Sequence, residues 1–323
     1  MSRVLVTGAN GFVGRELCKL LEHRGYEVRV ALRELMPDDE LSAYEQVATG
    51  ELGALSHFID RWKNALDNVD SVIHLAARVH VMKETSANPL AQFRAVNTEA
   101  PVCLAKQAAA QGVKRFIYVS SIKVNGEATA GGAFCADDRP EPGDAYAVSK
   151  AEAEAQLLEA GLDSSMQVVC VRPPLIYGPG VRGNFLRLIK LVEKGLPLPL
   201  AMIKNNRSMV SVGNMTDLLE CCITHPQAAG EIFLVSDGVS LSTPELISRL
   251  ADCMGVPARL FPVPRPLLKL AGKLIGQSSA ISRLCDSLEV DISKTREHLG
   301  WQPPQSVEAG IRAAVEGFTG SKK

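Results

Sequence analysis

A tyrosine and a lysine lie four residues apart in the segment DAYAVSKAEAEAQLL, at Tyr146 and Lys150. In a helix this spacing places both side chains on one face. A phenol is a poor acid or base near neutral pH unless its anion is stabilised, and a neighbouring ammonium group does that. Upstream, the run VKRFIYVSS ends in Ser120 and Ser121, whose hydroxyls could hydrogen-bond a substrate oxygen. The pair alone more often marks a solvated helix face, but with these serines it favours acid–base chemistry.

A glycine-rich turn near the start of the chain could hold a phosphate group. The segment GANGFVG places Gly8, Gly11 and Gly14 after an apolar run and before an amphipathic helical pattern. Glycine permits a tight strand-to-helix turn and lets a pyrophosphate approach the backbone. The helix that follows offers unpaired N–H groups to that anion. The spacing is G-x-x-G-x-x-G rather than the usual G-x-G-x-x-G, but its position predicts dinucleotide binding instead of a turn with only a packing role.

The residue after the second expected strand bears on which dinucleotide binds. An acid there would bind the adenosine ribose hydroxyls of NAD. The strand ends in ALR, with Arg33 at that place, and arginine suits a 2′-phosphate through forked, charge-assisted hydrogen bonds. We therefore expect NADP(H) to be preferred, with NAD(H) possible. The alternative is that Arg33 is a solvated surface side chain.

Alternating strand and helix patterns must position these groups. Short β-branched runs (VLVTG, YEVRVAL, 71–77, 113–121, 166–173) alternate with helical patterns, including 92–111 and 146–158. This alternation predicts an α/β fold with a Rossmann-type, doubly wound parallel sheet. After Pro173 the chain is rich in proline and glycine, then mainly helical. We expect a dinucleotide-binding domain over 1–173, with 207–238 returning to it, and a smaller substrate lobe over 174–206 and 239–320.

Composition excludes several function classes. The 323 residues carry a net charge of −1, so neither nucleic acid nor a membrane is an expected partner. We expect no signal peptide and no bilayer-spanning run. The basic amphipathic stretch PRPLLKLAGKLIG (264–276) is expected to pack on its own domain instead of on a bilayer. The eight cysteines form no CxxC pair, which favours buried thiols in a reducing cytoplasm and gives no metal site.

The chain resembles extended short-chain dehydrogenases/reductases, in the NAD(P)-dependent epimerase/dehydratase family that acts on nucleotide sugars. The matching segments run along almost the whole chain: TGANGFVG, HLAA at 74–77, Asn97, VSSIKVNG at 119–126, YAVSK, RPPLIYGPG and DISKTREHLGW. The resemblance implies a cytoplasmic enzyme. It also implies a homodimer whose seam is formed by the helices near 92–111 and 146–158.

The same resemblance assigns roles to individual residues. Ser121, Tyr146 and Lys150 become the catalytic set. Asn97 should fix local backbone geometry. The implied cofactor contacts are Gly8, Asn10, Gly11, Phe12, Val13, Gly14, Arg33, Glu51, Leu52, Leu75, Ala76, Ala77, Val119, Tyr146, Lys150 and Pro173. The implied substrate contacts are Arg78, Ser121, Lys123, Asn184 and Arg207, with His80 a weaker candidate; Leu175 stands where many epimerases have an asparagine.

The sequence argues against one activity of the family, 4,6-dehydration, and leaves three functions open. Dehydratases of this family resemble one another in an Asp-Glu pair after the catalytic threonine, and Ile122 and Lys123 cannot replace that pair. Both a 4-ketoreductase and a 4-epimerase would use the same triad, because both move a hydride at C4 and a proton at its oxygen. Two observations favour NADPH-dependent reduction of a UDP-linked 4-keto-6-deoxy-N-acetylhexosamine, for bacterial surface polysaccharide. One is Arg33, and the other is that LAARVHVM, SSIKVNGE and GLPLPL with NNRSMV resemble reductases that make sugars of the UDP-N-acetyl-quinovosamine type. The alternatives are a UDP-hexose or UDP-N-acetylhexosamine 4-epimerase with tightly bound NAD, and a non-catalytic NADP-binding sensor or subunit.

Overall fold

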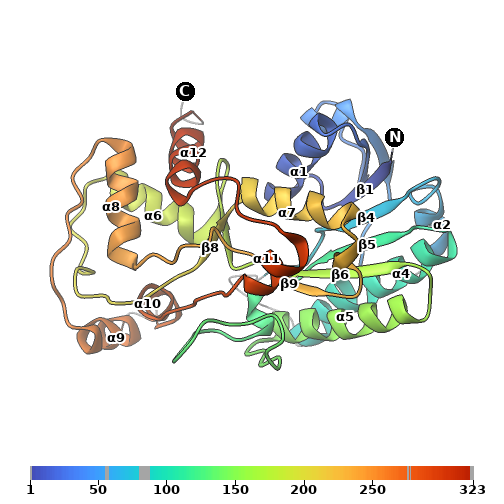
Figure 1. Ribbon diagram of the computed structural model, residues 1–323. Helices are drawn as coiled ribbons and strands as arrows, with labels where there is room; N and C mark the ends of the chain where they lie inside the picture. Colours follow the sequence, from blue (N-terminus) through green and yellow to red (C-terminus); the bar gives the residue numbers. More distant parts are fainter. Residues whose placement is uncertain (1, 55–57, 80–87, 275, 277, 321–323) are drawn as a thin grey trace.

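A parallel sheet forms the larger part of the molecule (Figure 1). The computed structural model describes residues 2–54, 58–79, 88–274, 276 and 278–320. Within these residues, seven parallel strands pair in the order β3-β2-β1-β4-β5-β6-β9. Their bounds are β1 Arg3–Thr7, β2 Glu27–Leu32, β3 Glu45–Ala48, β4 Ser71–His74, β5 Arg115–Val119, β6 Gln167–Arg172 and β9 Ile232–Leu234. The order reverses beside β1, as in doubly wound sheets, so the predicted fold class is confirmed.

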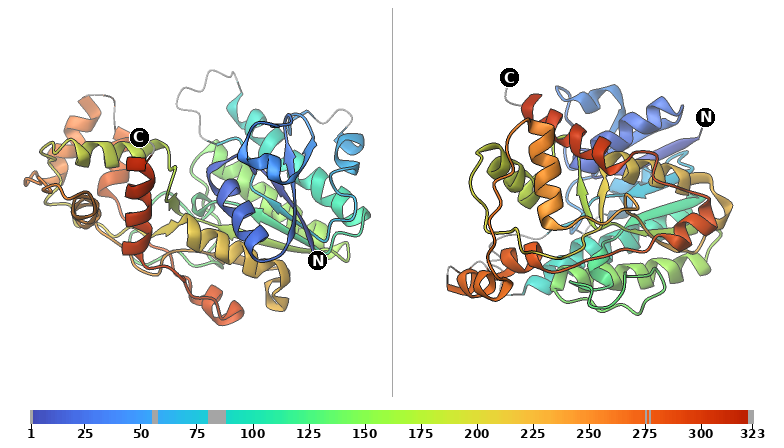
Figure 2. Two further views of the ribbon diagram at one scale, coloured as in Figure 1. Left: turned by 90° about the horizontal axis from the view of Figure 1, so that it is seen from above. Right: turned by 60° about the vertical axis from the view of Figure 1, so that its left-hand side comes forward.

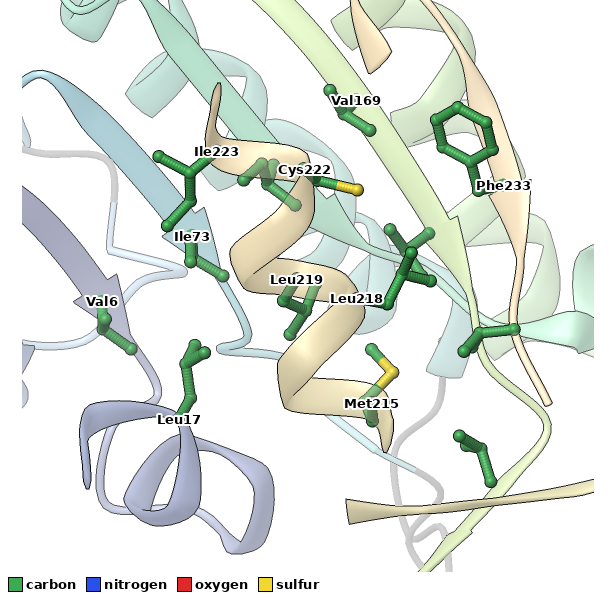
Figure 3. Packing of buried hydrophobic residues seen from close by; sticks show 14 of the residues in the cluster. Val6, Leu17, Ile73, Val169, Met215, Leu218, Leu219, Cys222, Ile223 and Phe233 are labelled. Atoms are coloured by element: carbon green, nitrogen blue, oxygen red, sulfur yellow. The ribbon is translucent and has the colours of Figure 1, made fainter. Parts of the chain in front are cut away.

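Helices cover both faces of this sheet. The larger ones are α1 Phe12–His23, α4 Ala100–Ala110, α5 Ala145–Leu162 and α7 Val212–Thr224; the shorter α2 and α3 span Phe58–Lys63 and Pro89–Arg94. Alternate residues of each strand face opposite sides, so Val4 and Val6 pack with α1 and α7 while Leu5 packs with α2, α4 and α5. Figure 3 shows α7 lying across the strands, with Leu218, Leu219 and Cys222 directed at them.

A smaller lobe follows the sheet. It contains the parallel pair β7 Leu175–Tyr177 and β8 Met209–Ser211, with α6 Gly183–Glu193, α8 Thr243–Met254, α9 Arg265–Leu274, α10 Ser278–Cys285 and α12 Val307–Gly320. Its own apolar cluster joins α6, α8 and α12. The short helix α11, Ser293–Leu299, returns to the main sheet beside β9. Figure 2 shows the two lobes side by side, with the C-terminus on the smaller one.

Three expectations need correction. The helix expected over 92–111 contains a π-helical segment at Ala95–Glu99, which includes Asn97, whose side chain bonds the Arg78 backbone. The cysteines are all free, but Cys103 and Cys135 are exposed, since they lie on outer surfaces of the fold. The amphipathic helix α9 packs on its own lobe and buries Leu268 and Gly272, but its other leucines are exposed.

Within the described residues, no helix combines the length and the apolarity that crossing a bilayer requires.

Candidate active site

The predicted chemical groups gather at the carboxyl edge of the sheet. Because all seven strands are parallel, their carboxyl ends lie on the same edge. The glycine turn follows β1, Leu75 to Ala77 follow β4, and Ser120 and Ser121 follow β5. Residues separated by more than a hundred positions in the sequence are thereby brought to one region.

The glycine turn is close to the end of β4. Gly8 has a φ of +68°, and a Cβ there would lie 2.7 Å from the Ala76 nitrogen. A Cβ at Gly14 would lie 2.3 Å from the Gly8 carbonyl oxygen. Only glycine fits these two positions without moving the backbone. Thr7 reinforces the junction, because its hydroxyl accepts a hydrogen bond from the Ala76 N–H at 3.2 Å.

The first turn of α1 is available to an anion. Gly11 is its N-cap residue and supplies no side-chain cap, so the first N–H groups of the helix are not satisfied from within the cap. Asn10 and Gly11 are exposed, and Gly14 is buried. Phe12 packs against the core of the smaller lobe and Val13 against the core beneath α1. The turn therefore fits a pyrophosphate, which would meet backbone N–H groups and the positive end of a helix dipole.

The first turn of α5 holds the phenol. The Asp144 carboxylate caps the helix by accepting a hydrogen bond from the Ala147 N–H at 2.8 Å. Tyr146 follows directly, and its ring meets the Phe93 ring edge-on at 6.1 Å. Burial raises the pKa of Tyr146 to about 12, while a hydrogen bond with Ser121 acts to lower it. Ser121 and Tyr146 thus lie within hydrogen-bonding reach, and the phenol is protonated at neutral pH.

The Lys150 side chain lies fully buried one turn further along α5. Its Nζ donates to the Val119 carbonyl oxygen at 2.9 Å and lies 4.4 Å from the centroid of the Tyr118 ring. Burial lowers the pKa of Lys150 to about 7. A lysine with its pKa near neutrality can change its charge state during turnover. Its nearest acid is Glu154, which acts to raise that pKa.

Asn97 lies in the π-helical segment and holds the loop after β4. Its Oδ1 accepts from the Arg78 N–H at 2.8 Å, and its Nδ2 donates to the Arg78 carbonyl at 3.0 Å and to the Ser149 hydroxyl at 3.1 Å. Both backbone groups of Arg78 are thereby fixed, as expected for Asn97. The guanidinium of Arg78 lies 5.6 Å from the centroid of Phe93, the ring that touches Tyr146. Arg78 and Tyr146 thus neighbour the same phenylalanine ring.

Two side chains at this edge have polar atoms without a partner among the described residues. Ser120 is buried, and its hydroxyl has no hydrogen-bond partner. His74 is also buried, and its ring stacks with the Phe116 and Tyr118 rings. Its Nδ1 shares a hydrogen bond with the Thr7 hydroxyl at 3.0 Å, whereas its Nε2 has no partner among the described residues. Burial lowers the pKa of His74 to about 3. The imidazole is neutral and plays no acid–base part, whereas Ser120 is a candidate for pairing with a bound ligand.

The sequence match decides the family. Residues 4–236 match the NAD dependent epimerase/dehydratase family. The chain belongs to the NAD dependent epimerase/dehydratase family. It is 46% identical over 318 residues to a UDP-glucose 4-epimerase of Vibrio cholerae, covering 98% of this chain and 95% of that one. It is 26% identical to a 2-alkyl-3-oxoalkanoate reductase of Stenotrophomonas maltophilia, over 96% and 97% of the two chains.

Solved structures share the whole fold. MoeE5 in complex with UDP-glucose and NAD superposes with a TM-score of 0.78 at 25% identity, covering 100% of both chains. The match includes the smaller lobe as well as the sheet. The chain is a member of this enzyme family and has the family's fold. Its glycine turn, Ser121, Tyr146 and Lys150 lie at the carboxyl edge of the parallel sheet.

The sequence analysis of this epimerase/dehydratase family member missed a buried ion pair behind the lysine. Glu154, four residues after Lys150 on the same helix, accepts three hydrogen bonds from Arg172 at 2.6 to 3.1 Å. Both side chains are no more than 3% exposed. Arg172 also donates to the Asn125 side chain at 3.0 Å. The spacing KAEAE placed Glu154 on the lysine's face of the helix, a signal that the sequence contained. Tyr118 was missed as well, since nothing local indicated its contact with Lys150.

Lys123 contacts acids close to the phenol. Its Nζ donates to Asp144 at 2.5 Å and to Glu127 at 2.8 Å. Asp144 is also the cap of the helix that carries Tyr146, so Lys123 links the segment after Ser121 to the start of α5. A role as substrate ligand would compete with these two ion pairs.

The remaining predicted residues lie in three places. Arg33 and Glu51 are both 71% exposed, with 3.8 Å between guanidinium and carboxylate. Leu52 and Leu75 pack against the two cores, and the buried Pro173 accepts the N–H of Ile122 at 3.0 Å.

Asn184 is exposed in the first turn of α6, with Arg187 at 3.5 Å. Arg207 is half-buried, and its guanidinium donates to the Asp286 carbonyl at 2.9 Å. Both lie on the smaller lobe. Leu175, in β7, is 43% exposed. His80 lies outside the described residues.

Proposed function

We propose that this chain is a UDP-hexose or UDP-N-acetylhexosamine 4-epimerase that retains NAD. The observation that carries the proposal is the 46% identity to a UDP-glucose 4-epimerase over almost the full length of both chains. Support comes from the contact between Ser121 and Tyr146, with Lys150 on the same helix. The sequence analysis preferred a 4-ketoreductase and kept this activity as its alternative, and the relatives favour the alternative.

The chain's own residues divide the work at the sugar. Ser121 hydrogen-bonds the C4 oxygen and aligns it with the phenol. Tyr146 removes the C4 hydroxyl proton as the keto sugar forms and returns a proton when the hydroxyl is restored. NAD, when bound, accepts and gives back the C4 hydrogen with its electron pair, and its positive charge favours the phenolate. Lys150 holds the end of β5 through the Val119 carbonyl, and because its pKa is about 7 it can carry or release a positive charge close to the site.

The cofactor preference is revised from NADP(H) to NAD. Glu51 lies 3.8 Å from Arg33, so a carboxylate shares the place where the adenosine ribose is expected. A carboxylate accepts hydrogen bonds from ribose hydroxyls and repels a 2′-phosphate. Its charge also offsets that of Arg33, which was the sole basis for the NADP preference. Solved neighbours of the same fold contain NAD.

A 4-ketoreductase remains the second candidate, because Arg33 is exposed and a relative with 26% identity is a reductase. Purified protein should be incubated with UDP-glucose and UDP-galactose, and separately with UDP-GlcNAc and UDP-GalNAc, while released cofactor is identified. Interconversion without added cofactor, with NAD released on denaturation, supports the epimerase. Stoichiometric NADPH oxidation by a UDP-4-keto-6-deoxy sugar, with no interconversion, refutes it.

The homodimer expected through α4 and α5 stays a prediction. Equilibrium sedimentation measures it directly.

A further inference from the structure

The far end of the smaller lobe carries a cluster of exposed apolar side chains. Among the described residues, twelve large apolar side chains are exposed, and half of them lie within 194–204 and 253–274: Leu196, Met202, Phe261, Leu267, Leu270 and Leu274. Two segments form this end together, because Leu198 and Phe261 pair through their backbones. A concentration of this kind marks an interaction surface more often than scattered leucines do.

The helix α9 contributes the strongest part of this surface. Leu267, Leu270 and Leu274 are 56%, 55% and 79% exposed, and their spacing places them on one side of the helix. The helix is anchored from another side by Leu268 and Gly272, which are buried. Figure 1 shows α9 at the end of the smaller lobe, away from the seven-stranded sheet. The leucine row is therefore presented outward by a helix that is itself held in place.

The charge around the leucine row is strongly positive. Residues 194–204 and 253–286 contain seven lysines and arginines and one acid, Asp286, although the whole chain has a net charge of −1. Arg265 and Lys269 pair with Asp286, so part of the excess is neutralised within the lobe. Lys273 and Arg283 add further exposed cations. A partner that covers this end must tolerate, or prefer, positive charge.

We propose that α9 binds the surface of a bilayer containing anionic lipids. Exposed leucines beside basic side chains are the features that let a helix lie in a membrane interface, and lysines and arginines are drawn to acidic head groups. A second copy of the chain is a poorer match. A two-fold interface places the same patch on both partners and would bring these cations together. The proposal is independent of the reaction at the carboxyl edge of the sheet.

The test is flotation of the full chain with vesicles of phosphatidylcholine, alone or mixed with phosphatidylglycerol. The wild type should float with the mixed vesicles and be released by high salt. The variant Leu267→Gln/Leu270→Gln/Leu274→Gln should lose about tenfold or more of its partitioning, because the apolar area that enters the interface is removed. Leu162→Gln is the matched control, since Leu162 is 87% exposed but lies on α5. Thermal unfolding checks that each variant is folded.

Three results would overturn the proposal. In the first, the wild type floats with neither kind of vesicle. In the second, the wild type and the triple variant float equally well. In the third, vesicles bind neither protein, and the wild type forms a concentration-dependent dimer that the triple variant does not form. The last result would assign the patch to a second copy. Selective loss of binding to the mixed vesicles in Lys273→Gln/Arg283→Gln would support the electrostatic part.

Discussion

Replacing Lys150 with methionine should stabilise the unliganded protein while removing most of its activity. Burial lowers the pKa of Lys150 from 10.5 to about 7, so the unfolded chain binds this proton more tightly than the folded chain does. With those two values, the lowered pKa of Lys150 destabilises the folded state by roughly 4 kcal/mol at pH 7 and roughly 3 kcal/mol at pH 8.5. The sign follows from the direction of the shift: between pH 7 and 10.5 the folded state gains stability as pH rises.

Methionine keeps the unbranched apolar stem and removes the charge. It also leaves the Val119 carbonyl without its 2.9 Å hydrogen bond, at a cost of about 2 kcal/mol. We therefore expect Lys150→Met to be more stable than the wild type by roughly 2 kcal/mol at pH 7 and roughly 1 kcal/mol at pH 8.5, with the difference near zero at about pH 9. Turnover should fall by about 10²- to 10⁴-fold.

The assay is urea unfolding of cofactor-free protein at several pH values, because bound cofactor would stabilise both proteins by mass action. Lower stability of Lys150→Met at pH 7 would refute the argument. So would a stability difference that does not change with pH, since the ammonium would then carry no burial penalty.

Three further predictions concern other parts of the site. Tyr146→Phe should lower turnover by about 10²- to 10⁴-fold while the released cofactor stays at wild-type levels; a substantially active variant contradicts the assigned acid–base role. Gly14→Ala should lose bound cofactor, because the new Cβ would lie 2.3 Å from the Gly8 carbonyl oxygen; cofactor absorbance at wild-type level would show that the turn can give way. Arg172→Met should lower the free energy of unfolding by about 3 to 5 kcal/mol because it leaves Glu154 buried and unpaired. Adding Glu154→Leu should restore most of that loss, and failure to restore it would place the damage in packing and not in charge.

Local patterns predicted most of the elements that position the site, with two informative failures. The runs that became β2, β4, β5 and β6 were expected, because period and composition alone specify a buried parallel strand. The strand β3, Glu45–Ala48, was not expected. It is a short, polar edge strand, and its pairing with β2 is a property of the assembled sheet.

The break in the helix over 92–111 has a similar origin. The segment's own pattern is helical throughout, and nothing local demands a wider turn at Ala95–Glu99. The turn coincides with Asn97, whose side chain bonds the Arg78 backbone, a partner that lies before it in the sequence and beside it only in the fold. Segments of this kind often occur at functional sites, so this failure of a local rule points toward the site.

The spacing of Tyr146 and Lys150 identified the reactive pair but not the environment that tunes it. The sequence predicted an ammonium beside the phenol, whereas the structure directs Lys150 to the Val119 carbonyl and the Tyr118 ring. Both partners belong to β5, and their approach depends on how α5 packs against the sheet. Burial has the largest effect on the pKa of both Tyr146 and Lys150. The spacing of residues in the sequence does not show how deeply a side chain is buried.

The pKa of Lys150 therefore depends on residues that touch no substrate. Burial pulls it down, and Glu154 pulls it up from the next turn of the helix. Glu154 is 3% exposed and is bound by Arg172 at the end of β6, so removing Arg172 would leave this carboxyl group buried without its ion-pair partner. Arg172 thereby holds the Glu154 carboxylate in the place from which it acts on Lys150. The pKa of Lys150 is thus set first by burial and then by Glu154, a side chain that Arg172 anchors to the end of the neighbouring strand.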